Sequence, residues 1–379
     1  MIEFDTAPAP LGPESHSFLS YARRLPSDPK TRSLGDRAVQ AIARMFYDRC
    51  CSHIRQYGSV NPARIKQRIE ERRARVVPGI AAFLKAYGAY RTESCHAVNP
   101  LHALGRADRD KRQSEKEARM RAWEEAAPIA HLACYTFAPG WQVESYNRWD
   151  ALNPGDYDRR LFYDPTCNYR SSLFIHKKTE QAVLCFDMTH WKDLGDWPAN
   201  LEQSFGLDIP RQYLQAAEAA GALKPIFGKS LCLAGYSKGA NMAMYAALMH
   251  EIPYISYAAT GLSDTTREHI GPRRCARASE LGRSFSISGD ILASPFGDDR
   301  SIGHYIGERT LGTSHLLDPD LTCLDTGARK LPVNPFLRIL AHDATAFPPT
   351  QSGRLPSLVR MMRDPRILQA RQDVCRLNR

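Results

Sequence analysis

The stretch Ser230-Leu-Cys-Leu-Ala-Gly235-Tyr-Ser237-Lys-Gly239-Ala-Asn-Met-Ala-Met-Tyr-Ala-Ala-Leu-Met249 decides the fold. It begins with a short apolar run that suits a buried strand, its centre reads Gly-x-Ser-x-Gly, and its Ala-, Met- and Leu-rich tail is typical of a buried helix. A serine on so sharp a turn has a strained backbone, and small flanking residues let the helix pass close to the strand. Gly235, Gly239 and Ala240 are small enough. The pattern therefore predicts a nucleophile elbow with Ser237 at its tip.

A serine nucleophile needs further groups, and the sequence offers candidates for each. The backbone N–H of Lys238 stands at the start of the expected helix, where it can donate to a developing oxyanion. A serine hydroxyl also needs a histidine as general base and a carboxylate that orients the histidine. On α/β-hydrolase folds the chain order is serine, acid, histidine, with the acid directly after a later strand. Asp290 fits this place, and Asp264, one strand earlier, is the alternative.

Three histidines follow Asp290, and spacing alone does not choose among them. His304 and His315 come soon after the acid, whereas His342 follows a long excursion and stands where a loop can fold back over Ser237. For each histidine, a structural role is the alternative to a catalytic one. We expect no metal and no other cofactor, because the serine chemistry requires neither.

Composition narrows the class of protein. The 379 residues are 43% hydrophobic, enough for one sizeable domain with an appendage, and the net charge is +10. Basic residues are spread along the chain, so the charge favours solubility first, with attraction to anionic lipid as a second role; no nucleic-acid partner is expected. The ten cysteines include no Cys-x-x-Cys pair, which favours a reducing compartment.

No apolar run is long enough to cross a bilayer, and the first residues do not resemble a signal peptide. We therefore expect a cytoplasmic protein, or one exported by a route without a cleavable signal peptide.

The rest of the chain divides into regions of different pattern. Runs at 172–176 and 182–186 predict a strand hairpin, 209–223 a helix, and 254–258 and 284–288 two further strands, so strands and helices alternate as in an α/β fold. Helical spacing over 37–53 and 62–86, followed by dense mixed charge from 105 to 125, predicts an N-terminal helical region. We expect four parts: a flexible tail (1–35), a charged helical region (36–125), the α/β domain (126–350) and a basic C-terminal extension (351–379).

Several blocks together resemble a known family. Ala182-Val-Leu-Cys-Phe-Asp-Met-Thr189, then Asp196-Trp197 and Asn200-Leu201, then Gly235-Tyr-Ser-Lys-Gly239, Gly289-Asp-Ile-Leu292 with His304-Tyr305, and finally His342-Asp343 are similar in order to the class 3, fungal-type lipases of the α/β-hydrolase superfamily. The resemblance covers roughly residues 126 to 348. It implies a mostly parallel sheet flanked by helices, and hydrolysis of a carboxylic ester, with a lipid acyl ester as substrate.

The resemblance also implies roles for single residues. Ser237 becomes the nucleophile, Asp290 the acid and the late His342 the base, while Thr189 supplies the second oxyanion donor beside Lys238. The loop after Thr189 becomes a lid. Its aromatic and apolar side chains suit peripheral contact with an anionic membrane, and they are Trp191, Leu194 and Trp197. The alternative is that both tryptophans are core residues that anchor the loop.

One departure from the family pattern bears on activity. The family has Arg-Gly where this chain has Asp187-Met188, which removes a charged contact that braces the loop. With the unmatched N-terminal third, this keeps open a second reading, a catalytically silent α/β-hydrolase scaffold that acts as an interaction protein. Against that reading, a silent scaffold has little reason to keep a strained elbow together with an acid and a late histidine in order.

Overall fold

A mostly parallel β-sheet forms the centre of the molecule. The computed structural model describes residues 32–57, 62–96, 106–134, 149–151, 158–189, 196–288, 290, 292–293 and 302–317. Within these residues the strands are β1 (Trp149–Ala151), β2 (Tyr163–Asp164), β3 (Tyr169–His176), β4 (Ala182–Phe186), β5 (Leu231–Tyr236), β6 (Tyr254–Tyr257), β7 (Gly282–Ile287) and β8 (Thr313–Leu317). The sheet order is β1-β3-β4-β5-β6-β7-β8, and β2 pairs with β3. From β4 to β8 all pairs are parallel, whereas β3 runs antiparallel to β1, β2 and β4.

Strands β4 and β5 are buried on both faces, which explains their continuous apolar sequences. Successive side chains alternate between two cores because the side-chain period of a strand is two. In β4, Val183 and Cys185 join one hydrophobic cluster, while Leu184 and Phe186 join the other. These two strands therefore lie at the middle of the sheet, with helices packed on each side.

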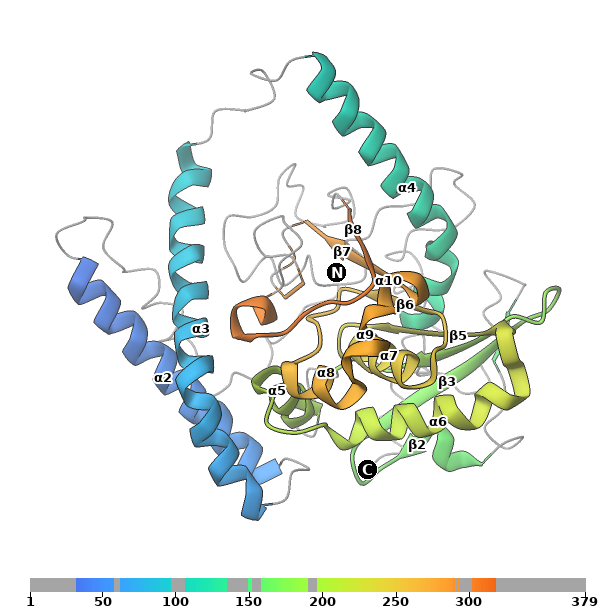
Figure 1. The fold of residues 1–379 in the computed structure, drawn as a ribbon, viewed down its shortest axis with the longest axis horizontal. Helices are drawn as coiled ribbons and strands as arrows, with labels where there is room; N and C mark the ends of the chain where they lie inside the picture. Colours follow the sequence, from blue (N-terminus) through green and yellow to red (C-terminus); the bar gives the residue numbers. More distant parts are fainter. Residues whose placement is uncertain are drawn as a thin grey trace, which may run out of the picture.

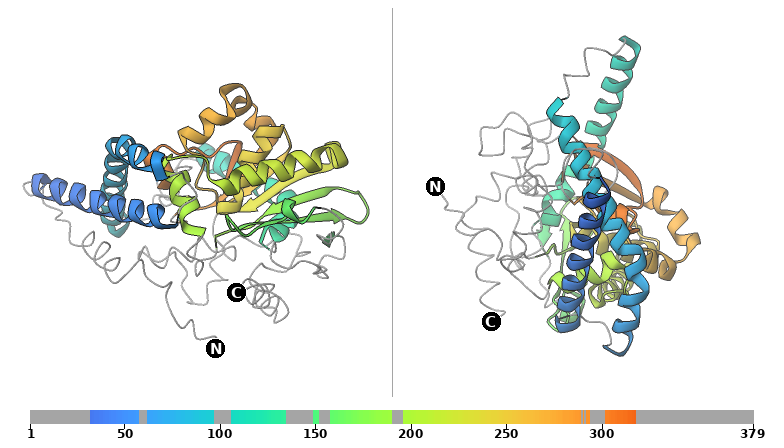
Figure 2. Two further views of the ribbon diagram at one scale, coloured as in Figure 1. Left: turned by 90° about the horizontal axis from the view of Figure 1, so that it is seen from below. Right: turned by 90° about the vertical axis from the view of Figure 1, so that its left-hand side faces the viewer.

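Helices connect the strands and cover the sheet. They are α5 (Asp196–Phe205), α6 (Arg211–Phe227), α7 (Lys238–His250), α8 (Asp264–Ile270), α9 (Pro272–Ala276) and α10 (Ala278–Leu281), with the 3-10 helices η5 (Arg159–Leu161), η6 (Gly228–Ser230) and η7 (Ile302–Ile306). Alanine-rich α6 and α7 pack together on one face, where small side chains let helix and sheet approach closely (Figure 2). The sheet and its crossover helices form an α/β-hydrolase-type fold, as the sequence predicts.

The other face of the sheet is covered from the N-terminal side of the chain. Helix α4 (Arg106–Cys134) places Trp123 and a run of apolar residues against β4 to β8. Trp123 meets Phe285 of β7 edge-on at 5.7 Å between ring centroids, and Tyr257 of β6 donates a hydrogen bond of 2.7 Å to the carbonyl oxygen of Ala126. The expected domain boundary at residue 126 thus falls inside a continuous helix, whose second half completes the core.

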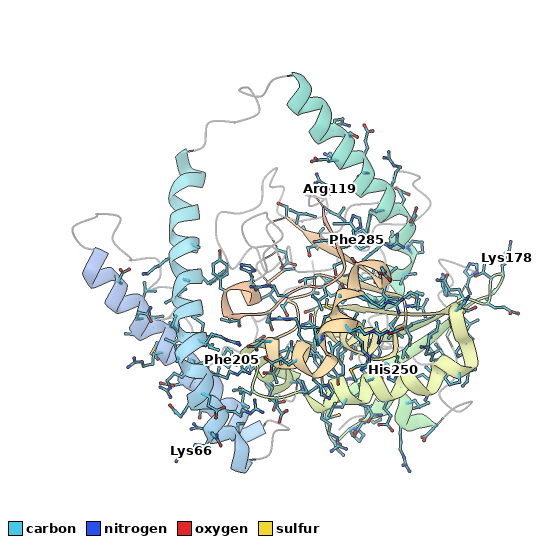
Figure 3. The ribbon with its side chains drawn as sticks, in the orientation of Figure 1. Lys66, Arg119, Lys178, Phe205, His250 and Phe285 are labelled. Carbon is cyan, nitrogen blue, oxygen red and sulfur yellow. The ribbon has the colours of Figure 1, made fainter. Side chains whose placement is uncertain are left out.

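Helices α2 (Arg32–Tyr57) and α3 (Pro62–His96) form a hairpin beside the sheet, next to α5 and η7, and do not cover a sheet face (Figures 1 and 2). Tyr47 of α2 contacts Phe205 of α5 with 5.0 Å between ring centroids, and Figure 3 shows Phe205 at this junction. A Cβ atom at Gly79 of α3 would overlap the carbonyl oxygen of Tyr305 in η7, so the helix backbone lies directly on that turn. The charged helices expected in this region are confirmed, and α2 begins at Arg32, inside the expected tail.

The remaining expected elements are confirmed with small shifts of their ends. The predicted hairpin is β3 and β4, the predicted helix at 209–223 is α6, and the two later strands are β6 and β7. The basic extension 351–379 and most of the tail lie outside the described residues.

Candidate active site

Ser237 is the single residue that joins β5 to α7, and its backbone has the geometry that the Gly-x-Ser-x-Gly pattern predicts. Its φ is 54° and its ψ is −117°, a strained conformation for a residue with a side chain. A Cβ at Gly235 would overlap the backbone of Gly239, and one at Gly239 would overlap the carbonyl oxygen of Phe186. Ser237 is partly exposed, whereas the residues from Leu231 to Ala240 around it are buried. The two glycines therefore let strand and helix meet so closely that the serine is raised at their junction.

The backbone amides at the start of α7 point toward the same edge of the sheet as Ser237. The amides of Ala240 and Asn241 donate to the Ser237 carbonyl oxygen, at 3.1 and 3.3 Å, which fixes the first turn. Lys238 is the first residue of the helix, at the positive end of its dipole. An anion that develops beside Ser237 would thus meet the Lys238 N–H at the helix N-terminus.

Thr189 lies on the neighbouring segment, three residues after the end of β4. It is buried, and its Oγ1 accepts a hydrogen bond of 2.8 Å from Nδ2 of Asn200 in α5. That bond uses a lone pair of the oxygen, so the hydroxyl hydrogen can still be donated. Because β4 and β5 run parallel with Phe186 opposite Gly235, Thr189 and Ser237 follow adjacent strand ends.

Asp290 follows β7 and is completely buried. Its Oδ1 accepts hydrogen bonds from the backbone amides of Leu292 and Ala293, at 2.8 and 3.2 Å. Its own amide donates to the Ile287 carbonyl oxygen at 3.1 Å, so both the backbone and the side chain of Asp290 are fixed by hydrogen bonds within the turn. Asp290 therefore follows the C-terminal end of a parallel strand, as the chain order predicts, and its role as the acid stays a prediction.

The alternative acid, Asp264, has a different set of partners. It is the first residue of α8, after the N-cap Ser263. Its Oδ2 forms ion pairs with Arg72, at 2.8 Å, and with Arg75, and both arginines belong to α3. The carboxylate therefore fastens the N-terminal hairpin to the α/β domain.

Of the three candidate histidines, the two nearer ones are described. His304 lies in η7, where its Nδ1 is 3.3 Å from Nη1 of Arg309. His315 lies within β8 and stacks on Phe285 at 4.8 Å between ring centroids. Burial, reinforced by Arg283 and Arg119, lowers the pKa of His315. His342 lies outside the described residues, so its role as base stays a prediction.

Asp187, where the chain departs from the family pattern, forms an ion pair that was not predicted from the sequence. Asp187 is buried, and its Oδ2 lies 3.1 Å from Nε of Arg170 on β3. The backbone amide of Asp187 also donates to the Arg170 carbonyl oxygen at 3.1 Å. The segment thus has a charged brace with the acid on the loop and the arginine on the adjacent strand. An arginine just before the predicted strand 172–176 is the sequence feature that hints at it.

The polar contacts around the buried residues Asn241 and Glu308 were also not predicted from the sequence. Nδ2 of Asn241 donates to Oγ1 of Thr260 at 2.8 Å, and the amide of Gly261 donates to Oδ1 of Asn241 at 3.1 Å, so α7 is tied to the loop after β6. The carboxyl group of Glu308 is buried beside Gly303, and its burial raises its pKa to about 8.

The expected lid has no described geometry, because Trp191, Leu194 and the side chain of Trp197 lie outside the described residues. Among the helices that the structure describes, none combines the length and the apolar character that a membrane crossing demands.

Comparison with known proteins relates this region to phospholipases. A family model described as a Tle-like phospholipase domain matches residues 126–307, a range that contains Ser237 and Asp290 and ends before His342. The extracellular phospholipase A1 of Serratia liquefaciens is 36% identical over 141 residues, which make up 36% of this chain and 43% of that protein. The chain thus spans less than half of this relative.

Proposed function

We propose that the chain is a serine hydrolase that cleaves an acyl ester of a phospholipid. The observation that carries the proposal is the strained backbone of Ser237 at the junction of β5 and α7. Such strain has a cost, and a fold keeps it where a serine must be presented to a substrate. The likeness to phospholipases supports the substrate class, and the narrower resemblance to class 3 lipases stays a prediction.

In the proposed mechanism, Ser237 attacks the ester carbonyl carbon while His342 takes the hydroxyl proton. The oxyanion that forms accepts hydrogen bonds from the Lys238 amide and from Thr189. His342 then gives the proton to the leaving alcohol, and an acyl-enzyme remains on Ser237. Water, deprotonated by His342, then attacks this ester. As the acyl–oxygen bond breaks and the fatty acid leaves, His342 returns the proton to the Ser237 oxygen, and Asp290 holds the imidazole in the required tautomer throughout.

The test replaces Ser237 by Ala in the full chain. Hydrolysis of a fatty-acyl p-nitrophenyl ester and of phospholipid vesicles should fall about 10⁴-fold or more, because no nucleophile remains. Labelling by a fluorophosphonate should disappear at the same time. Ser230→Ala makes the same chemical change at an exposed position before β5 and should leave both readouts at the parent level.

The same assays test which histidine is the base, and they distinguish a serine hydrolase from a catalytically silent scaffold. His342→Ala should match the loss in Ser237→Ala, whereas His304→Ala and His315→Ala should keep most turnover. A folded parent protein that neither turns over esters nor takes up the probe would overturn the proposal and leave the scaffold reading. Full activity of Ser237→Ala would place the nucleophile elsewhere.

A further inference from the structure

The segment between β4 and Thr189 is held at both of its ends. At its start, Asp187 is bound twice to Arg170 of β3, through the ion pair and through the backbone hydrogen bond. The antiparallel register pairs Ser171 with Phe186, so these contacts extend the pairing of β3 and β4 one residue beyond the strand end. At the other end of the segment, Thr189 accepts a hydrogen bond from Asn200.

The same segment touches the first turn of the helix that carries the elbow. A Cβ atom placed at Gly239 would overlap the Phe186 carbonyl oxygen and would lie 3.0 Å from the Asp187 carbonyl oxygen. The backbone at Phe186 and Asp187 is therefore in direct contact with the start of α7, where the Lys238 amide lies. Any displacement of Asp187 changes the distance between the two proposed oxyanion donors.

Burial makes the ion pair a determinant of geometry. The exposed fraction of the side chain is 3% for Asp187 and 13% for Arg170. Two charges removed from water gain little net stability from each other, but either one left without the other is strongly unfavourable. The ion pair joins one carboxylate oxygen of Asp187 to Nε of Arg170, so the attraction of the two charges holds these side chains together. The pair therefore restricts where the backbone of Asp187 can lie.

We propose that Arg170 and Asp187 are positioning residues for ester hydrolysis, and that their ion pair holds residues 187–189 against α7 so that Thr189 and the Lys238 amide converge on one oxyanion. This inference rests on the proposed function. It assigns the acid in this chain a role that the Arg-Gly of similar lipases would fill differently. Neither residue touches the reacting atoms.

The inference predicts a specific kinetic signature. The oxyanion exists only in the transition state, so misplaced donors lower kcat and leave KM nearly unchanged. A contact that merely stabilises the fold would instead lower the amount of folded enzyme and leave the kcat of the folded fraction as it was. The two roles are separated by measuring kcat per active site, with the active sites counted by fluorophosphonate titration.

The experiment is a double-mutant cycle in the full chain with Asp187→Asn, Arg170→Gln and the two together. Asparagine keeps the shape of aspartate, glutamine keeps the arginine side chain only as far as the position of Nε, and both remove the charge. Each single variant should lower kcat for a p-nitrophenyl ester about 10- to 100-fold, less than the roughly 10²- to 10³-fold that removal of one oxyanion donor costs, because the donor is displaced and not removed. KM should stay within about twofold, the rate of fluorophosphonate labelling should fall in parallel, and the double variant should lose less than the product of the two single losses. Arg170→Lys, which keeps the charge but places it differently from the guanidinium, should fall between parent and Arg170→Gln.

The matched control is Arg283→Gln, which breaks an arginine–carboxylate contact of 2.8 Å with Glu125 at the exposed surface of the same sheet. It should change neither kcat nor the labelling rate. If folded Asp187→Asn and Arg170→Gln both turn over at the parental kcat, the pair is only structural and the inference is wrong, while the proposed function stands. If the parent protein is neither active nor labelled, the proposed function and this inference fall together.

Discussion

The elbow and the docked hairpin α2–α3 both depend on a glycine that has another backbone pressed against it. At the elbow, Gly235 of β5 faces Gly239, its neighbour in the same motif; at the hairpin, Gly79 of α3 faces Tyr305 of η7, far along the chain. In both places a single added methyl group would overlap a carbonyl. The contact between Gly235 and Gly239 can be predicted from a short stretch of sequence, because both residues belong to one motif. The contact between Gly79 and Tyr305 joins distant segments and is visible only in the folded chain. Two equally tight backbone contacts can therefore differ greatly in how well the sequence predicts them.

The two regions also differ in what surrounds the contact. The elbow lies in the middle of the sheet with buried residues on both sides, so its backbone has no room to shift. The hairpin lies at the side of the sheet and is held by a smaller cluster around Tyr47, Phe205 and Ile306, together with ion pairs at the surface. We therefore expect the hairpin to loosen independently, and the elbow to fail only with the whole domain.

The largest effect is expected for Gly235→Ala. The new Cβ would overlap the Gly239 backbone, and because neither β5 nor α7 can move, the free energy of unfolding should fall by about 3 kcal/mol or more. Fluorophosphonate labelling should be lost even in the protein that remains folded, since Ser237 and the start of α7 must separate. Urea unfolding followed by circular dichroism measures the first effect. A stable, fully labelled Gly235→Ala would show that the elbow is not as tightly packed as described.

A smaller and more local effect is expected for Gly79→Ala. The overlap is with the Tyr305 carbonyl oxygen, but η7 is a short turn that can shift, so the cost should be about 1–2 kcal/mol. Hydrogen exchange measured by mass spectrometry should show faster exchange in α2 and α3, with α7 and β5 unchanged. Ala82→Gly, at an exposed position of the same helix, removes about 1 kcal/mol of helix propensity without adding an atom near η7, so it shows how much faster exchange becomes when the helix alone is weakened. Equal acceleration throughout the sheet would contradict the independence of the hairpin.

The sequence predicted features whose residues are close together in the chain, and it did not predict contacts between residues that are far apart in the chain. Gly235, Ser237 and Gly239 were predicted because one strand–turn–helix pattern contains all the residues that meet. The α/β class followed from alternating strands and helices. The cover that α4 provides was missed, because no local pattern in the mixed charges before Trp123 identifies the sheet face on which the helix packs. The brace at Asp187 was missed for the same reason, because its partner Arg170 belongs to another strand. The role of His342 as the base remains a prediction from the family resemblance.

The smallest effect, and the sharpest separation of the two regions, is expected for Asp264→Asn. This change removes the carboxylate shared by Arg72 and Arg75 but keeps the shape of the side chain. All three side chains are partly exposed, at 16%, 36% and 23% for Arg72, Arg75 and Asp264, so solvent screening limits the loss of stability to about 1 kcal/mol. The repulsion between the two arginines would then no longer be offset by the carboxylate, and raising the salt concentration should screen it and restore part of the loss.

The same variant separates the two candidate acids. Asp264→Asn should keep kcat within about threefold, because its carboxylate belongs to the hairpin contact, whereas Asp290→Asn should lower kcat about 10⁴-fold through loss of the histidine tautomer. The control for stability is Glu125→Gln, which breaks an exposed pair with Arg283 and should change the free energy of unfolding by no more than about 0.5 kcal/mol. If Asp264→Asn abolished turnover and Asp290→Asn did not, the acid would lie one strand earlier, and the ion pairs with α3 would have to open during catalysis.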